Sequence, residues 1–222
     1  MNLQALPEEA LKEILALTEA KKRLDLQEEA YDHFMPFAHH VYDNFIEGRH
    51  HRIIAEKLEA VARGECKRLI INMPPRHSKS EFASYLMPAW FLGRNPKLKI
   101  IQATHNTELA VRFGRKVRDL IDDPAYKEIF PETNLKEDNK GAGKWGTDKG
   151  AEYFAAGVGA AITGRGADLL VIDDPHSEQD ALSETAFDHA YEWYTSGPRQ
   201  RLQPGGSIII VMTRWGKKDL TG

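Results

Sequence analysis

The sequence has little of several features that mark common classes of protein. Its single cysteine, Cys66, excludes an internal disulfide and a zinc cluster of cysteines, and it favours a reducing compartment. The longest aliphatic run, residues 208–212, is far shorter than the roughly 20 residues that a membrane helix requires. The N-terminus lacks the basic and then apolar order of a signal peptide. We therefore expect a cytoplasmic protein without a membrane anchor.

An excess of charge of one sign is also missing. The 222 residues contain 30 Lys and Arg against 33 Asp and Glu, a net charge of −3. Residues 1–30 hold seven acids and four bases, which accounts for all of this difference. This balance excludes a globally basic nucleic-acid binder, although it leaves a local basic face open. With 41% hydrophobic and 28% charged residues, the composition is that of an ordinary globular protein.

Two kinds of hydrophobic pattern alternate along the chain. Helical spacing predicts helices over residues 1–30, which are acidic and amphipathic, and over 51–62, which Gly64 should end. Another helix should begin after the capping residue Asn106 and close at Pro124. Short, continuously apolar runs predict buried strands. Four such runs are residues 69–73, 99–103, 169–172 and 208–212. The alternation predicts an α/β fold with a mainly parallel central sheet flanked by helices.

The segment from Met73 to Ser80 follows the first predicted strand and precedes a helical pattern. Against G-x-x-x-x-G-K-[ST], Lys79 and Ser80 fit, whereas Met73 and Ser78 replace both glycines. Backbone amides at the start of a helix suit a phosphate, because the helix dipole favours an anion there. Lys79 would neutralise the β- and γ-phosphates, and the Ser80 hydroxyl would ligate Mg²⁺. The residues predicted to bind ATP are Pro75, Arg76, His77, Ser78, Lys79, Ser80 and Glu81. The pattern alone leaves a solvated loop with a chance Lys-Ser pair open as the alternative.

Two adjacent carboxylates, Asp173 and Asp174, follow the third predicted strand. A nucleotide hydrolase needs one carboxylate near the metal and a second to orient or deprotonate the attacking water. Neighbouring residues at a strand end can divide these roles, because one faces the metal and the other the nucleophile. We therefore predict Asp173 as a metal ligand with Ser80, and Asp174 as the catalytic carboxylate. An ordinary Asp-Asp-Pro turn is the alternative.

Taken together, these features resemble the ATPase domain of tailed-phage terminase large subunits, the motors that package DNA into capsids. The resemblance extends from about residue 63 to 222 and rests on segments 68–81, 92–96, 162–168, 172–175 and 213–215, with Asp219 and Leu220. It implies a P-loop NTPase fold of the RecA-like (ASCE) class over 63–222, after an N-terminal helical region, 1–62. Two residues depart from the familiar form of the family. Ser78 stands where a glycine is usual, and Asp174 where a glutamate usually serves.

The resemblance also implies roles for residues that the loop pattern does not assign. Arg76 and Lys79 would act with Asp174 in catalysis, and Thr213 with Arg214 would couple hydrolysis to movement. Such motors use an arginine from a neighbouring subunit to stabilise the transferred phosphoryl group. Arg165, in a glycine-flanked loop, is the predicted residue. The runners-up are Arg199 and Arg201.

The partners and setting implied by the resemblance are those of a virus-encoded motor in the host cytoplasm. It would use ATP and Mg²⁺ and contact the backbone of double-stranded DNA without sequence preference. It would work with a portal and a small terminase subunit, as a homo-oligomeric ring when assembled and as a monomer in isolation. Full-length large terminases also carry a C-terminal nuclease domain. This sequence has no such region, so we expect it not to cleave DNA by itself.

Two other functions stay open on the residues alone. A metal-dependent nuclease using Asp173 and Asp174 would need carboxylates from several strands, and Asp219 is the plausible third. A nucleotide-binding assembly module without hydrolysis is suggested by the departures at Ser78 and Asp174. Hydrolysis of ATP to drive DNA into a procapsid is the leading hypothesis.

Overall fold

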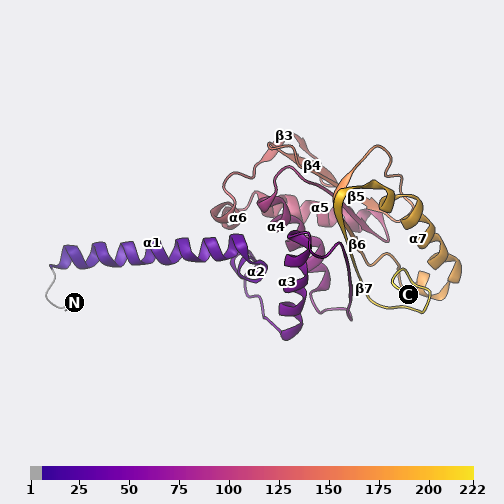
Figure 1. Cartoon of the computed structure of the whole chain (residues 1–222), viewed down its shortest axis with the longest axis horizontal. Coiled ribbons are helices and arrows are strands. Elements are labelled where there is room, and N and C mark those ends of the chain that lie inside the picture. The colour runs from indigo at the N-terminus through magenta and orange to yellow at the C-terminus, as the bar shows by residue number, and fades with distance from the viewer. Residues whose placement is uncertain (1–6) are drawn as a thin grey trace.

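The computed structural model describes residues 7–222, in which helices cover a seven-stranded sheet (Figure 1). The strands are β1 (Arg68–Asn72), β2 (Lys99–Thr104), β3 (Leu135–Lys140), β4 (Lys144–Thr147), β5 (Glu152–Gly157), β6 (Ala167–Asp173) and β7 (Leu202–Met212). The α-helices are α1 (Glu8–Asp32), α2 (Phe34–Val41), α3 (Arg49–Ala62), α4 (Met87–Arg94), α5 (Thr107–Ile121), α6 (Pro124–Ile129) and α7 (Glu184–Ser196). Shorter helical turns are the π-helical η2 (Glu81–Leu86) and the 3₁₀ turns η3 (Asp180–Leu182) and η4 (Pro198–Arg201).

The strands are ordered β1-β7-β6-β2-β5-β4-β3 across the sheet. The first five strands of this order, β1, β7, β6, β2 and β5, run parallel to one another. Strand β4 runs antiparallel to both of its neighbours, β5 and β3. The predicted α/β fold with a mainly parallel sheet is therefore confirmed. The last strand in the chain, β7, lies between β1 and β6, so the carboxyl ends of these three strands are neighbours. Ligands of open α/β sheets bind at that edge.

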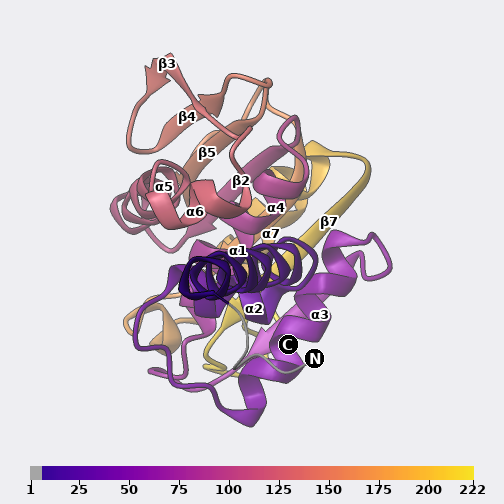
Figure 2. The same cartoon turned by 90° about the vertical axis from the view of Figure 1, so that its left-hand side faces the viewer.

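The two faces of the sheet bury two separate hydrophobic cores. Alternate residues of a strand point to opposite faces, so Leu169 and Val171 of β6 lie in the larger core and Leu170 and Ile172 in the smaller one. Helices α2 to α5 cover the larger core, and α7 covers the smaller core from the other side (Figures 1 and 2). The predicted domain boundary at residue 62 falls at the end of α3. Helices α2 and α3 share the larger core with the sheet.

Several predicted element ends agree with the structure, and others are wrong. Gly64 adopts a φ of +77° just after α3, a left-handed conformation that glycine allows at a helix end. The Asn106 side chain caps α5 by accepting a hydrogen bond from the amide of Leu109 at 2.8 Å. Pro124 does not close that helix: α5 ends at Ile121, and Pro124 begins α6. Proline suits this first position because its missing N–H would have no partner there.

Strands β3, β4 and β5 were not predicted, and β7 begins six residues before the predicted run. The sequence of β3, LKEDNK, contains one apolar residue, because this strand lies at the edge of the sheet. A continuous apolar run identifies only strands that are buried on both faces.

Helix α1 projects away from the rest of the molecule (Figure 1). The predicted helix is confirmed from Glu8 onward, and residues 1–6 lie outside the described part of the chain. Its apolar side chains contribute little to the core: Leu15, Leu17 and Leu24 are 61%, 64% and 64% exposed. Within residues 7–222, no helix is long and apolar enough to cross a membrane.

Candidate functional site

The loop between β1 and η2 has a strained backbone. Arg76 and Ser78 have φ angles of +63° and +57°, in the left-handed region that residues with a Cβ rarely adopt. Helical structure begins immediately after Ser78, at Lys79. Alternating right- and left-handed residues turn successive amides toward one side, which creates a concave, anion-binding surface. Ser78 therefore holds the backbone shape that a glycine would adopt more easily.

Lys79, Asp174 and Thr213 meet at the carboxyl edge of the sheet. Lys79 is buried, with only 6% of its surface exposed, and its ammonium lies 2.9 Å from Oδ2 of Asp174. The Thr213 amide donates to Oδ1 of the same carboxylate at 2.9 Å. The Thr213 hydroxyl donates to the carbonyl of Met73 at 3.3 Å, which ties the end of β7 to the loop after β1. The strand order brings these residues together from three distant parts of the chain.

The backbone of Asp174 is also held at an unusual angle, with a φ of +40°. Its amide donates to the carbonyl of Val211 in β7 at 2.9 Å, and its carbonyl accepts from the amide of His105 at 3.1 Å. Such strained residues cluster at functional sites, where the surrounding structure fixes them. The sequence prediction missed His105, although a polar residue directly after the buried strand β2 was the available signal.

Asp173 is almost completely buried, with 1% of its surface exposed. The Ser80 hydroxyl donates to its Oδ1 at 3.0 Å, and burial raises the pKa of the carboxyl to about 7. Its Oδ2 has no hydrogen-bond partner within the described residues. Hydroxyl and carboxylate oxygens are ligands that Mg²⁺ prefers. Because no group of three or more His, Cys, Asp or Glu in the described chain could hold a metal, further ligands would have to come from a substrate and water.

A cleft of about 640 Å³ opens beside these groups. Its walls come from the loops that follow β1, β2, β6 and β7. They comprise Pro75, Lys79, His105, Asn106, Leu109, Asp174, His176, Ser177, Glu178, Gln179, Thr213 and Trp215. Its position at the carboxyl ends of the strands suits a nucleotide phosphate chain approaching the sheet edge.

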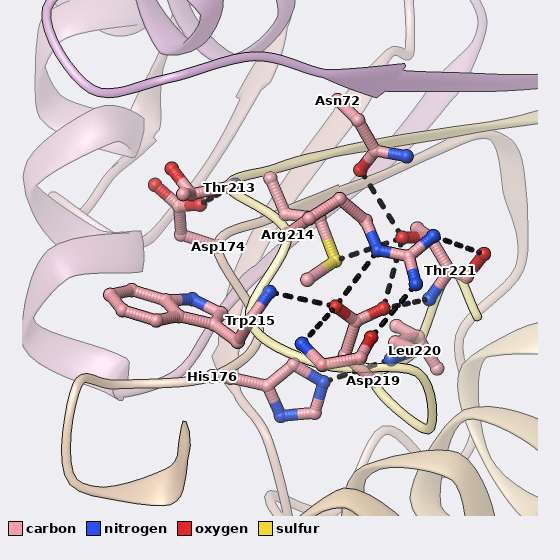
Figure 3. Close-up of polar contacts among 11 residues, drawn as sticks. Asn72, Asp174, His176, Thr213, Arg214, Trp215, Asp219, Leu220 and Thr221 are labelled. Carbon is pink, nitrogen blue, oxygen red and sulfur yellow. Dashed lines mark hydrogen bonds and ion pairs between the residues drawn. The ribbon is translucent and has the colours of Figure 1, made fainter.

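The segment after β7 turns back on itself around Asp219, away from Asp174 (Figure 3). The Asp219 Oδ2 accepts hydrogen bonds from Arg214 Nε at 3.0 Å, the Trp215 amide at 2.8 Å and the Gly216 amide at 3.1 Å. Its Oδ1 accepts from the amide and the hydroxyl of Thr221, each at 3.2 Å. Burial raises the pKa of Asp219, but these hydrogen bonds and the Arg214 charge outweigh it and lower the pKa. Asp219 thus organises the segment that contains Arg214.

His176 joins this segment to the loop after β6. Its Nε2 accepts a hydrogen bond from the amide of Leu220 at 3.0 Å, so the ring is neutral and carries its proton on Nδ1 (Figure 3). The ring packs edge-on against Phe187 of α7, at a centroid distance of 4.8 Å. Burial lowers the pKa of His176, which agrees with the neutral ring. Neither His176 nor the central role of Asp219 in this segment was predicted from the sequence.

Three other predicted residues of the loop lie at its margin. Arg76 is exposed, and His77 Nδ1 donates to the carbonyl of Pro75 at 2.8 Å. Glu81 is turned toward α5, where its two oxygens lie 2.9 and 2.8 Å from the Lys116 ammonium. Glu81 therefore connects η2 to α5.

The predicted arginines do not reach the cleft of their own chain. Arg165 precedes β6, and its guanidinium stacks 3.9 Å from the ring centroid of Phe154. Asp173 lies at the other end of this seven-residue strand, roughly 20 Å away at about 3.3 Å per residue. Arg199 and Arg201 lie in η4, before β7, at the same amino edge of the sheet. An action of Arg165 on the cleft thus requires another subunit and stays a prediction.

No protein-family model and no curated protein matches the chain. Among solved structures, it is similar to the crystal structure of the HK97 bacteriophage large terminase, with a TM-score of 0.43 and 13% sequence identity. The match covers 76% of this chain and 33% of the other, so the chain spans about a third of that protein's length. At this identity the likeness concerns the fold alone, and with so low a TM-score no argument rests on it.

Proposed function

We propose that the chain hydrolyses ATP as the motor domain of a terminase-like DNA-packaging machine. The observation that carries the proposal is the convergence of Lys79, Asp174 and Thr213 at the ends of adjacent parallel strands, beside Ser80 and the buried Asp173. A cation and a carboxylate that line the cleft, with a hydroxyl and a second carboxylate beside them, are the groups that phosphoryl transfer to water requires.

The loop after β1 would bind the phosphates of the nucleotide. The left-handed residues Arg76 and Ser78 shape its backbone, and the following helix begins at Lys79. Amides at such a helix start attract anions through both hydrogen bonding and the helix dipole. Lys79 would contribute a positive charge from a position that is shielded from water. These features support nucleotide binding despite the missing glycines.

Asp173 and Ser80 fit a magnesium site. The Ser80 hydroxyl lies 3.0 Å from Oδ1 of Asp173, so these two oxygens are the pair that the ion would contact. Bound Mg²⁺ would supply charge to stabilise the phosphates during transfer. The role of the chain's own residues is to hold this charge at a fixed place, away from competing water.

Asp174 would orient the attacking water. Its carboxylate is fixed by Lys79 and by the Thr213 amide. A phosphate that approached Lys79 would compete with the carboxylate for the ammonium and so leave Asp174 Oδ2 able to accept a hydrogen bond from water. Because the Thr213 amide donates to Oδ1 of Asp174, a movement of this carboxylate would displace Thr213 at the end of β7. This contact supports Thr213, followed by the Arg214 segment, as the coupling element.

A neighbouring groove suits the backbone of DNA. It has a volume of about 420 Å³, shares His105, Asn106 and Leu109 with the cleft, and contains Arg112 and Arg115 of α5. Neither of these arginines has an ion-pair or hydrogen-bond partner in the described chain. Two free cations one helical turn apart match successive phosphates without reading sequence. We propose this groove as the DNA contact, although Glu108 also lines it.

The decisive experiment measures phosphate release from ATP and Mg²⁺ over a wide range of protein concentrations. Lys79→Ala should reduce turnover by orders of magnitude, while Lys12→Ala, on exposed α1, is a matched control that leaves turnover unchanged. Activity per subunit should rise with concentration if another subunit supplies an arginine. Wild-type turnover in Lys79→Ala would overturn the proposal.

The two alternatives have less support. A nuclease would need a third carboxylate, but both oxygens of Asp219 are occupied by backbone amides, a hydroxyl and Arg214. An assembly module that binds ATP without hydrolysis would show nucleotide affinity in wild type and no phosphate release at any concentration.

A further inference from the structure

A group of buried polar atoms without partners lies behind the Asp173 carboxylate. Eight buried side-chain nitrogen and oxygen atoms lack a hydrogen-bond partner in the described part of the chain, and five of them belong to this group. They are Oγ of Ser84, both amide atoms of Gln102, the hydroxyl of Tyr153 and Oδ2 of Asp173. Their concentration in one place calls for a common explanation.

Strand register places Gln102, Tyr153 and Asp173 on the same face of the sheet. Thr104 of β2 is paired with Asp173, and Gln102, two residues earlier, therefore points to the same side as Asp173. Tyr153 of β5 is paired with Ile100, one further step along that face. Diagonal neighbours of this kind are about 7–8 Å apart, within reach of long side chains. Gln102 thus lies between Asp173 and Tyr153 on the sheet face that carries the larger core.

Electrostatic effects agree with this placement. Burial raises the pKa of Tyr153, and the charge of Asp173 raises it further. Burial raises the pKa of Asp173, and the Ser84 hydroxyl opposes that shift, which places this hydroxyl beside the carboxyl. The Ser84 hydroxyl acts on the pKa of Asp173 as a hydrogen-bond donor would, although neither Ser84 Oγ nor Asp173 Oδ2 has a partner of good hydrogen-bond geometry. Tyr153 and Ser84 thus lie close enough to Asp173 to affect or feel its charge, yet the hydrogen-bonding capacity of all three is left unsatisfied.

Such an arrangement is costly in an otherwise apolar core. Gln102, Ser84 and Tyr153 are each completely buried, and their surroundings include Ile100 and Val171. A buried polar atom that has lost water and gained no partner destabilises the fold, and an apolar residue of the same size would not. A water molecule held by two to four polar groups is the ordinary solution.

We propose that Ser84, Gln102, Tyr153 and Asp173 form an internal hydration site, and that Gln102 and Tyr153 are positioning residues for the Asp173 carboxylate. Water bound there would donate to Oδ2 and accept from the amide or the phenol, which orients the carboxylate and favours its charged form. The positioning role rests on the proposed function of Asp173 as a magnesium ligand. The hydration site itself does not.

The chain offers a matched pair of tyrosines for the test. Tyr126 is as buried as Tyr153, but its hydroxyl donates to the carbonyl of Ala89 at 2.9 Å. Tyr126→Phe should lower the melting temperature by about 2–4 °C, because a satisfied hydrogen bond is lost. Tyr153→Phe should lower it by less, because the internal water keeps its other partners after the phenol is lost. An equal loss in both variants would overturn the hydration site, because it would mean that the Tyr153 hydroxyl has a direct protein partner.

A high-resolution crystal structure of the full chain provides the direct readout. An ordered water within hydrogen-bond distance of Asp173 Oδ2 and the Gln102 amide is expected, and Gln102→Met should displace it. Direct side-chain hydrogen bonds in place of that water would overturn the proposal.

Calorimetric titration of wild type, Gln102→Met and Tyr153→Phe with ADP at several Mg²⁺ concentrations then tests the positioning role. The Mg²⁺ concentration for half-maximal ADP affinity should rise severalfold in both variants and stay unchanged in Tyr126→Phe. An unchanged Mg²⁺ requirement in the presence of the water would exclude positioning. Wild type that binds no ADP would instead contradict the proposed function and leave the crystallographic result standing.

Discussion

The Lys79 ammonium lies 2.9 Å from the Asp174 carboxylate, so the cation offered to a phosphate is also the counter-ion of the carboxylate offered to water. Both residues lie at the carboxyl edge of the sheet: Lys79 begins the helix that follows the loop after β1, and Asp174 directly follows β6. A nucleotide phosphate and Asp174 would therefore compete for one ammonium. Binding and hydrolysis should respond in opposite directions when this competition is removed.

Asp174→Asn tests this competition. Loss of one negative charge beside Lys79 should tighten ATP binding severalfold, whereas turnover should fall by about 10²–10⁴-fold, the usual contribution of a positioned general base. Equilibrium binding and phosphate release measure the two effects separately. Asp25→Asn, on α1, serves as the control for a lost surface carboxylate. Retained turnover would show that Asp174 does not act on the attacking water.

Ser78→Gly should stabilise the protein. At a φ of +57°, Ser78 carries a steric cost of about 1 kcal/mol that glycine does not have. The melting temperature should therefore rise by about 2–4 °C, with ATP binding retained. Ser78→Ala is the matched control, because it keeps the Cβ and hence the strain. Thermal unfolding of all three proteins makes the comparison. A fall in stability for both Ser78→Gly and Ser78→Ala would indicate that the Ser78 hydroxyl has a structural role.

Acidification should loosen the segment that follows β7. Burial lowers the pKa of His176 from its ordinary value of 6.5, against the opposing charges of Asp219 and Asp180. Below pH 6.5 the unfolded chain therefore binds a proton that the folded ring resists, and the free energy of unfolding falls as the pH drops. A protonated ring also cannot accept the Leu220 amide.

His176→Gln keeps an acceptor near Nε2 but does not titrate. The free energy of unfolding by denaturant is measured for both proteins at pH values between 5 and 8, in steps of about half a pH unit. Below pH 6.5, wild type should lose stability relative to this variant. Parallel curves for the two proteins would mean that His176 does not control this pH dependence.

Mixing inactive variants tests whether Arg165 acts on another subunit. Lys79→Ala lacks a competent cleft and Arg165→Ala lacks the predicted donor, so each should be inactive alone. A mixture should recover part of the phosphate release, because some interfaces will combine an intact cleft with an intact Arg165. Arg201→Ala mixed with Lys79→Ala gives the same measurement for the runner-up. Full activity of Arg165→Ala alone would contradict its predicted role.

Arg112 and Arg115 should contribute to the salt dependence of DNA binding. Replacing both with alanine should weaken binding to all DNA sequences alike and reduce the slope of log affinity against log salt by about 2, roughly 1 for each phosphate contact. Arg199→Ala, at the opposite edge of the sheet, should leave the slope unchanged. Fluorescence anisotropy with two unrelated duplexes at several salt concentrations measures both effects. An unchanged slope in the double variant would exclude this groove.

The parts of the fold that were predicted correctly are those with an unambiguous local pattern. The buried strands β2 and β6 are continuous apolar runs, and Asn106 and Gly64 mark helix ends by local backbone chemistry. Strand β3 could not be found in this way, because an edge strand with charged side chains has no such pattern. Pro124 was misassigned because proline is common both just after the end of a helix and at its first position, so the residue alone does not tell which applies.

In the candidate site, the sequence alone determined which chemical groups stand at the strand ends: the lysine and serine after β1, the two carboxylates after β6 and the threonine after β7. Tertiary structure decided that these groups meet, because inserting β7 between β1 and β6 is a long-range choice with no local signal. It also separated Asp173 from Asp174, burying one carboxylate against Ser80 and turning the other toward Lys79 through a left-handed backbone. Adjacent residues of a strand already face opposite sides, but how deeply each is buried depends on the segments from elsewhere in the chain that pack around it.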